Sequence, residues 1–193
     1  MKFNLVLLTG IGLVATVCSQ QQINPECFNR PNNKHLKECC ATPNFIPTRE
    51  EFTTCMQRFP KPDLPPTPGS SPPVFNCMAQ CMLEELGIMT NDVLSKDAAT
   101  SKLVSLVGSS SDWQTVAKTS VDTCYQKVAA TLSEKNSLGC SVAAGTFFDC
   151  LPTTMFTDCP TSAWTPSDEC NQLKVHLLNG CPIMTLMKGP NMP

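Results

Sequence analysis

The sequence lacks the residue spacing of a metal site and the motifs of common catalytic sites. It has no Cys-x2-Cys pair, and its two histidines, His35 and His176, lie far apart, whereas zinc sites gather Cys and His at short spacings. A Gly-x-Ser-x-Gly elbow, a His-Glu-x-x-His helix and a phosphate-binding glycine loop are also missing. We therefore expect no metal, no cofactor and no enzymatic activity.

Charged residues are scarce as well. They make up 16% of the chain, against about 25% in typical globular proteins. Asp and Glu number 16 against 14 Lys and Arg. A surface with this balance does not attract a phosphate backbone, so we expect no nucleic-acid partner. The hydrophobic share of 41% is sufficient for a buried core, and we expect a folded protein.

Long apolar runs are confined to the N-terminus. Lys2 precedes an apolar stretch from Leu5 to Val17, and the small residues Val17 and Ser19 suit cleavage. This is the pattern of a secretory signal peptide, which we place at residues 1–19. No later run reaches about 18 apolar residues, so we expect no membrane span in the mature protein. Residues 20–193 are therefore predicted to be secreted and extracellular.

Cysteine is abundant, with 13 residues. Removal of the signal peptide takes Cys18 and leaves an even set, which in an oxidising compartment predicts up to six disulfides. A bond between the neighbours Cys39 and Cys40 would be strained, so each is expected to reach a different segment. The predicted disulfide residues are Cys27, Cys39, Cys40, Cys55, Cys77, Cys81, Cys124, Cys140, Cys150, Cys159, Cys170 and Cys181.

We interpret residues 20–193 as one domain, because the cysteines are spread along all of it. The segment 60–73 has seven prolines in fourteen positions. It is predicted to be a stiff, extended connector, since proline suits neither a helix interior nor a strand interior. Residues 182–193 form a C-terminal tail with two open alternatives: it folds over the mouth of a pocket, or it frays.

Between these breaks the hydrophobic residues recur at helical spacing. Thr48 and Glu51 form a capping box before the first predicted helix, and Asn76 and Thr165 are predicted to cap two others. Alternating strand patterns are nearly absent, so the fold class is all-α, with six to eight short helices. The predicted helices span residues 48–59, 76–87, 91–107, 112–128, 140–151 and 165–180.

Cys77 and Cys81 lie one turn apart on one face of a predicted helix, so two different segments must reach them. The cysteine motif reads Cys77-x3-Cys81-x42-Cys124-x25-Cys150-x8-Cys159-Pro160, with further cysteines at both ends. It resembles the Plus-C subclass of insect odorant-binding proteins. The segment CMLEELGIMTNDV, which starts at Cys81, is similar to the stretch after the third cysteine in the wider family. The resemblance covers most of the mature chain and implies a disulfide-stapled pocket of helices.

The resemblance also implies a core disulfide pairing. Its first cysteine corresponds to Cys55 or, alternatively, to Cys40. The six cysteines outside the core set would form the additional bridges of the subclass, with partners that remain open. With Cys55 as the first cysteine, the implied bonds are Cys55–Cys81, Cys77–Cys150 and Cys124–Cys159.

The function that the resemblance implies is the carriage of small apolar molecules in extracellular fluid, as in olfaction and sensory transduction, with a chemoreceptor as a further partner. Methionine and phenylalanine, nine each in the full chain against one tyrosine, are compatible with an adaptable apolar lining. Each candidate has a second interpretation as an ordinary core residue. The ligand-binding candidates are Leu86, Met89, Leu103, Leu106, Trp113, Val116, Val121, Phe147, Phe148 and Leu177.

Three alternatives stay open. One is a secreted disulfide scaffold that binds a protein partner without a small-molecule cavity, with residues 60–73 as a polyproline recognition strand. Another concerns assembly, since the protein is either a monomer or a homodimer. The third is pH-triggered ligand release through His35 or His176, although surface positions are the favoured interpretation of both.

Overall fold

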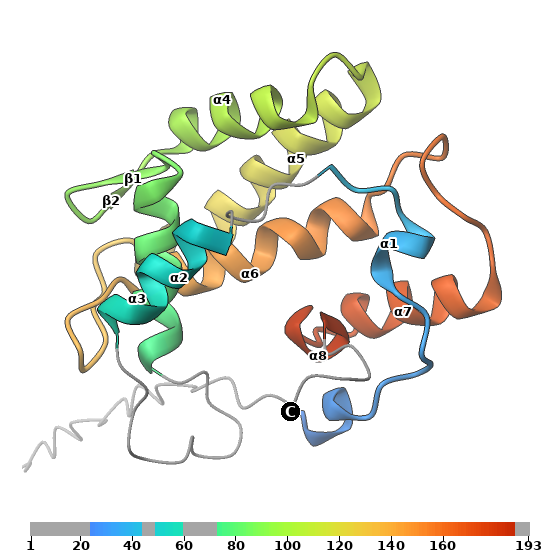
Figure 1. Ribbon diagram of the computed structural model, residues 1–193, viewed down its shortest axis with the longest axis horizontal. Coiled ribbons are helices and arrows are strands. Elements are labelled where there is room, and N and C mark those ends of the chain that lie inside the picture. The colour runs from blue at the N-terminus through green and yellow to red at the C-terminus, as the bar shows by residue number, and fades with distance from the viewer. Residues whose placement is uncertain (1–23, 44–48, 60–72, 188–193) are drawn as a thin grey trace, which may run out of the picture.

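The computed structural model describes residues 24–43, 49–59 and 73–187 of the chain. The predicted signal peptide, the capping residue Thr48, the connector apart from Pro73, and residues 188–193 of the tail lie outside these ranges. The described residues form eight α-helices, two short 3-10 helices and one two-stranded hairpin (Figure 1). The all-α prediction is therefore confirmed.

In chain order, the elements begin and end as follows: η1 Pro25–Phe28, α1 Leu36–Cys39, α2 Arg49–Arg58, α3 Pro73–Glu85, β1 Met89–Thr90, β2 Val93–Leu94, α4 Lys96–Val107, α5 Ser111–Val128, η2 Ala129–Thr131, α6 Val142–Thr157, α7 Asp168–Leu178 and α8 Met184–Met187.

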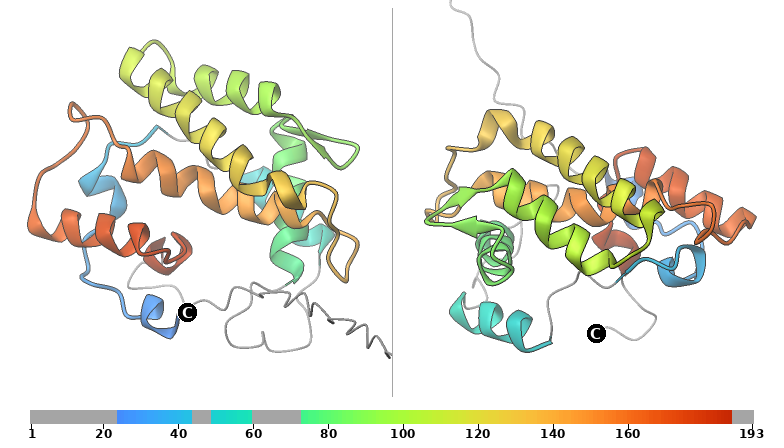
Figure 2. Two further views of the ribbon diagram at one scale, coloured as in Figure 1. Left: turned by 180° about the vertical axis from the view of Figure 1, so that it is seen from behind. Right: turned by 90° about the horizontal axis from the view of Figure 1, so that it is seen from above.

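Helix α6 is the central helix of the described structure. It packs against α3, α5 and α7, and α4 covers the outer side of α5 (Figures 1 and 2). Its side chains Phe147, Met155 and Phe156 are almost fully buried. α3 comes close to α6 where Gly145 faces Asn76, and a Cβ atom at Gly145 would lie 2.0 Å from the Asn76 Oδ1. The prediction that Asn76 caps α3 is wrong, because the helix already begins at Pro73.

Serine residues cap four of the helices. The Oγ atoms of Ser95, Ser110, Ser141 and Ser167 accept hydrogen bonds from backbone N–H groups in the first turns of α4, α5, α6 and α7. Such a bond satisfies one of the donors that a helix start leaves unpaired. Ser167 therefore replaces the predicted cap Thr165, and α7 begins at Asp168.

The predicted helix over residues 91–107 is wrong at its N-terminal end. Residues 89–94 form a hairpin in which Met89 pairs with Leu94 and Thr90 with Val93. The turn residues Asn91 and Asp92 have positive φ angles of 50° and 65°, a conformation that Asn and Asp tolerate better than most residues and that type I′ hairpin turns require. The helix therefore starts only at Lys96.

The predicted end of the helix over residues 140–151 is also wrong. α6 begins at Val142 and continues through Pro152 to Thr157. A proline inside a helix removes one backbone hydrogen bond and costs about 3 kcal/mol. Burial of Met155 and Phe156 beyond the proline offsets that cost, because a fully buried large apolar side chain contributes about 1.5–3 kcal/mol.

Six disulfides join the twelve predicted cysteines. Cys39 and Cys40 bond to different segments, as predicted, and two different segments also reach Cys77 and Cys81. The bonds are Cys27–Cys181, Cys39–Cys170, Cys40–Cys159, Cys55–Cys81, Cys77–Cys140 and Cys124–Cys150.

Of the implied core pairs, Cys55–Cys81 is confirmed and the other two are wrong. Cys77 bonds Cys140 rather than Cys150, and Cys124 bonds Cys150 rather than Cys159. The start of α6 lies beside α3, where the backbone N–H of Ser141 donates to the side chain of Gln80 at 2.8 Å. Cys150 lies roughly 12 Å further along the helix axis. It therefore meets α5 rather than the first turn of α3.

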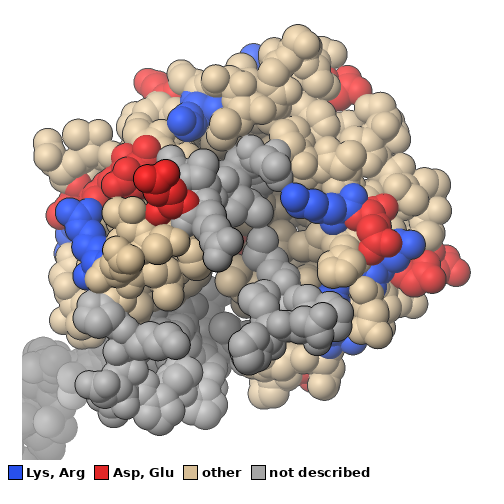
Figure 3. Space-filling model, in the orientation of Figure 1, with Lys and Arg blue, Asp and Glu red and all other residues tan. Residues whose placement is uncertain are grey.

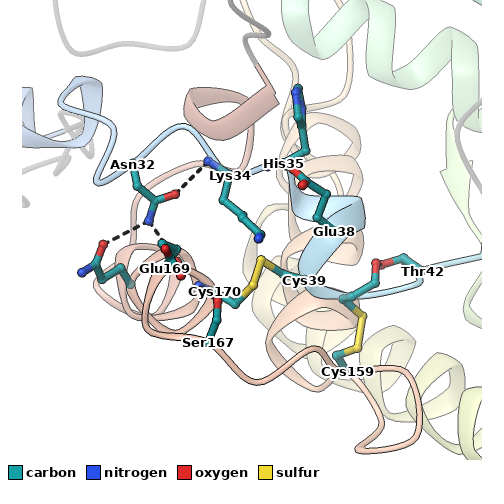
Figure 4. Close-up of a disulfide and its surroundings, with 12 residues drawn as sticks. Asn32, Lys34, His35, Glu38, Cys39, Thr42, Cys159, Ser167, Glu169 and Cys170 are labelled. Atoms are coloured by element: carbon teal, nitrogen blue, oxygen red, sulfur yellow. Dashed lines mark hydrogen bonds between the residues drawn. A yellow bond between two sulfur atoms is a disulfide. The ribbon is translucent and has the colours of Figure 1, made fainter.

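The N-terminal segment is bonded to α7 and the loop that precedes it. Cys39–Cys170 and Cys40–Cys159 lie side by side in Figure 4. The Asn32 amide donates to the Glu169 carbonyl at 3.0 Å. The backbone N–H of residue 165 also donates to the Cys39 carbonyl at 2.8 Å. These contacts hold the two ends of the described chain together.

The predicted C-terminal tail lies within the described residues as far as position 187. Ile183 and Leu186 are buried and α8 spans Met184–Met187, so residues 182–187 do not fray. The Cys27–Cys181 bond holds this short helix near η1.

We expect Ser120→Ala to stabilise the protein. Ser120 on α5 is fully buried, and its Oγ has no hydrogen-bond partner in the described part of the chain. Removal of a buried, unpaired hydroxyl should raise the free energy of unfolding by about 1 kcal/mol, measured by denaturant unfolding of the oxidised protein. The matched control, Ser95→Ala, removes a helix cap and should lower the same quantity by about 1 kcal/mol. Destabilisation by both substitutions would contradict the assignment of Ser120 as unpaired.

Candidate functional site

The predicted ligand contacts are mainly in the closed core. Six of the ten are buried in one large apolar cluster formed by α3 to α8. Their side chains are at most 7% exposed, so they contact protein atoms on nearly all sides. A ligand can reach them only if packed side chains separate. The six are Met89, Leu103, Trp113, Val121, Phe147 and Leu177.

The other four candidates are more open. Leu86, Val116 and Phe148 are half-buried and pack against the same large cluster. Leu106 is 36% exposed on α4. Of the ten, Phe148 is the one that also packs against a second apolar cluster.

This second group, which we call the α2–α3 cluster, surrounds the Cys55–Cys81 disulfide. Cys55, Cys81 and Met82 are buried, whereas the neighbouring Phe59 and Met78 are half-buried, as is Phe148 of α6. Sequence reasoning missed Phe59 and Met78 as candidates. The signal that could have found them is their position one turn from Cys55 and Cys81 on the same helical faces.

An open surface cavity of about 570 Å³ runs along α7. None of the ten predicted contacts lines it. Polar side chains dominate, and four of them follow one face of α7. The lining residues are Pro31, Asp168, Asn171, Gln172, Val175, His176 and Asn179.

His176 is not the simple surface residue that the sequence suggested. It is half-buried, and its Nε2 lies 3.1 Å from the Thr185 Oγ1 at the start of α8. The Thr185 hydroxyl also donates to the Pro182 carbonyl at 2.7 Å. Burial lowers the pKa of His176, and a hydrogen bond with the Cys27 backbone partly opposes that shift.

Asp149 is a half-buried acid on α6. Burial raises the pKa of its carboxyl, and the charge of Lys127 on α5 acts in the opposite direction. The described residues offer this carboxyl no hydrogen bond in compensation. The protein therefore holds one acid in an environment that disfavours its charge.

Charge elsewhere is dispersed. Figure 3 shows small groups of both signs separated by uncharged surface on the face in view. In residues 24–43, 49–59 and 73–187, no group of three or more His, Cys, Asp or Glu side chains is placed to hold a metal ion. Within the same ranges, no helix combines the length and the apolar character that crossing a bilayer requires.

A helical body closed by interlocked disulfides, with an apolar interior and little surface charge, defines the structural class of insect odorant-binding proteins. The chain belongs to the AgamOBP47-like family, whose model matches residues 49–176. The twelve bonded cysteines fit the Plus-C pattern, which has more bridges than the three of the core set.

Three relatives from Anopheles gambiae are similar along most of the chain. "Odorant-binding protein 47" is 26% identical, with 94% of this chain and 83% of the relative covered. "General odorant-binding protein 67" is 24% identical, with 79% and 77% covered. "General odorant-binding protein 68" is 26% identical, with 80% and 74% covered.

We expect His176→Gln to reduce the loss of stability on acidification. Because burial lowers the pKa of His176 in the folded protein, the unfolded chain takes up a proton more readily. The stability associated with the neutral imidazole is therefore lost as the pH falls through about 6.5 and below. Melting temperatures at pH 8 and pH 5 should differ less in the variant than in the wild type. His35→Gln, which removes an exposed imidazole, serves as the control.

The pH dependence of stability expected from Asp149 is opposite in sign to that expected from His176. Its raised pKa means that the unfolded chain releases the proton first, so stability is lost as the pH rises from the ordinary range of an Asp through the higher folded value. Asp149→Asn should raise the melting temperature at pH 7 and have little effect near pH 3. Asp122→Asn removes an exposed carboxylate that pairs with Lys96 at 2.7 Å and should give no such gain. Equal effects of Asp149→Asn at both pH values would contradict the burial argument.

Proposed function

We propose that the protein is a carrier that binds small hydrophobic molecules, of the odorant or semiochemical kind, in an apolar helical pocket. Family membership over residues 49–176 is the observation that carries the proposal. Three relatives that are similar along most of the chain are named odorant-binding proteins, which supports the same role here. The low surface charge and the large apolar interior are compatible with it.

The ten candidates remain the proposed ligand contacts: nine lie in or against the large cluster, and Leu106 is exposed on α4. The half-buried Leu86, Val116 and Phe148 are the side chains that a ligand would meet before the interior opens. Trp113, at 7% exposure, would serve either as a wall of the pocket or as a packing anchor of α5. Ligand entry would then require the helices around α6 to separate.

The carrier is proposed to act outside the cell. The signal pattern of residues 1–19 and the six disulfides both support an oxidising, extracellular compartment. Delivery of the bound molecule to a chemoreceptor would place the protein in sensory transduction.

Titration of the oxidised mature protein with a fluorescent apolar probe tests the carrier. We expect saturation near one probe per chain, displacement by long-chain alcohols, aldehydes or aromatics at micromolar concentrations, and a higher melting temperature. A ligand at 100 times its Kd stabilises the folded state by about 2.7 kcal/mol. Absence of a saturable site in protein with all thiols bonded would exclude the carrier.

One observation favours a second candidate function, a scaffold that binds a protein partner. The α7 cavity is open, and five of its seven lining residues have polar side chains that could hydrogen-bond to a protein partner. In that case the probe would bind weakly and without saturation, and the melting temperature would not respond to apolar ligands.

A further inference from the structure

Helix α2 is attached to the rest of the described structure in an unusual way. Its main packing partner is α3, and in the right-hand view of Figure 2 it stands apart from the other helices. Of the α2 side chains that the structure describes, Cys55 is the one that is fully buried. Phe52 is 42% exposed. The helix therefore contributes little apolar burial of its own.

Among the described side chains, a disulfide and an ion pair join α2 to α3. The first is the disulfide Cys55–Cys81, near the middle of both helices. The second is an ion pair between Arg58 and Glu84 at 3.8 Å, with side chains 61% and 31% exposed. Exposed ion pairs contribute little to stability. The disulfide is therefore the attachment that decides where α2 can go.

α3, by contrast, is anchored firmly. Cys77–Cys140 bonds it to the segment before α6. Gln80 of α3 accepts a hydrogen bond from the Ser141 backbone at 2.8 Å. Asp92 of the hairpin is a further partner of the Gln80 amide. Because α3 is fixed and α2 is joined to it through one covalent bond, motion of α2 pivots on Cys55–Cys81.

Large apolar side chains that are not fully buried meet at this pivot. Phe59 follows α2, Met78 belongs to α3 and Phe148 to α6, and all three are half-buried. The residues of the α2–α3 cluster carry no charge. Methionine and phenylalanine give a soft, adaptable surface, and such a surface suits a neutral apolar molecule.

Phe148 connects this surface to the interior. It packs against the α2–α3 cluster and also against the large cluster around α6. An apolar molecule held beneath α2 would thus touch a side chain that belongs to both clusters. The six buried candidates of the large cluster, by contrast, are at most 7% exposed.

We propose that Phe59, Met78 and Phe148 form the surface that first binds the apolar ligand, and that α2 is the movable wall of this site, hinged on the Cys55–Cys81 disulfide. The inference rests on the proposed carrier function and adds to it the location of the entry site, the neutral class of the ligand and the element that opens. The disulfide limits how far α2 separates from α3, and so sets the rate at which a bound molecule leaves.

The first test removes the hinge. In the full mature protein, the double variant Cys55→Ser/Cys81→Ser should show faster hydrogen exchange in residues 49–58 and unchanged exchange in α5 and α6. Dissociation of a neutral fluorescent apolar probe, followed by stopped flow, should be about tenfold faster or more. The control, Cys27→Ser/Cys181→Ser, loses a disulfide that lies away from α2 and should leave the dissociation rate within twofold of the wild type.

The second test keeps all six disulfides. Phe59→Ala and Met78→Ala each truncate a half-buried side chain, so the fold should persist, and each should weaken probe binding by about fivefold or more. Phe28→Ala truncates a side chain that is 64% exposed elsewhere and should not change the affinity.

The outcomes separate the two proposals. If the wild type binds no probe, the carrier function fails. If the wild type binds the probe but Phe59→Ala and Met78→Ala bind it equally well, the entry site is wrong and the carrier function stands. If removal of either disulfide changes the dissociation rate to the same extent, α2 is not the hinged wall.

Discussion

The packing of the other helices depends on the two disulfides that fix α6 and the segment before it. Cys124–Cys150 joins this helix to α5, and Cys77–Cys140 joins the segment before it to α3. Each bond removes freedom from the unfolded chain and is typically worth about 2–4 kcal/mol. With α6 fixed between two neighbours, short helices that bury only one stripe each can share a single core. The same bonds make α3 a rigid support for α2.

The disulfides are unevenly distributed over the described structure, and their distribution bears on which helix can separate from the others. Cys27–Cys181, Cys39–Cys170 and Cys40–Cys159 hold the N-terminal segment against α7, the loop before it and the start of the tail. Backbone hydrogen bonds between residues 39–41 and 163–165 reinforce that region. Among the described side chains, the attachments of α2 include one disulfide, the exposed Arg58–Glu84 ion pair and a small apolar contact. Because six disulfides hold the described structure together, separation of an element costs least free energy where its attachments are few.

The polar exceptions in the apolar interior are few and informative. Ser120 is buried without a partner, and Asp149 carries a carboxyl that burial destabilises in its charged form. Each position costs the fold some stability. His176 links α7 to α8 through Thr185, so its protonation bears on the contact between α7 and α8, whose Leu177 and Leu186 belong to the large cluster.

The sequence by itself determined the helical class, the number of disulfides and the family resemblance, because helical periodicity and cysteine spacing are local properties. The tertiary structure decided which cysteine faces which. Cys150 is ten residues beyond Cys140, and the crossing of α6 over α3 and α5 gave Cys77 and Cys124 different partners from those expected. It also decided that residues 89–94 form a hairpin, that α6 continues past Pro152, and that Phe59, Met78 and Phe148 pack against one cluster. These depend on contacts between segments far apart in the chain, which local patterns do not encode.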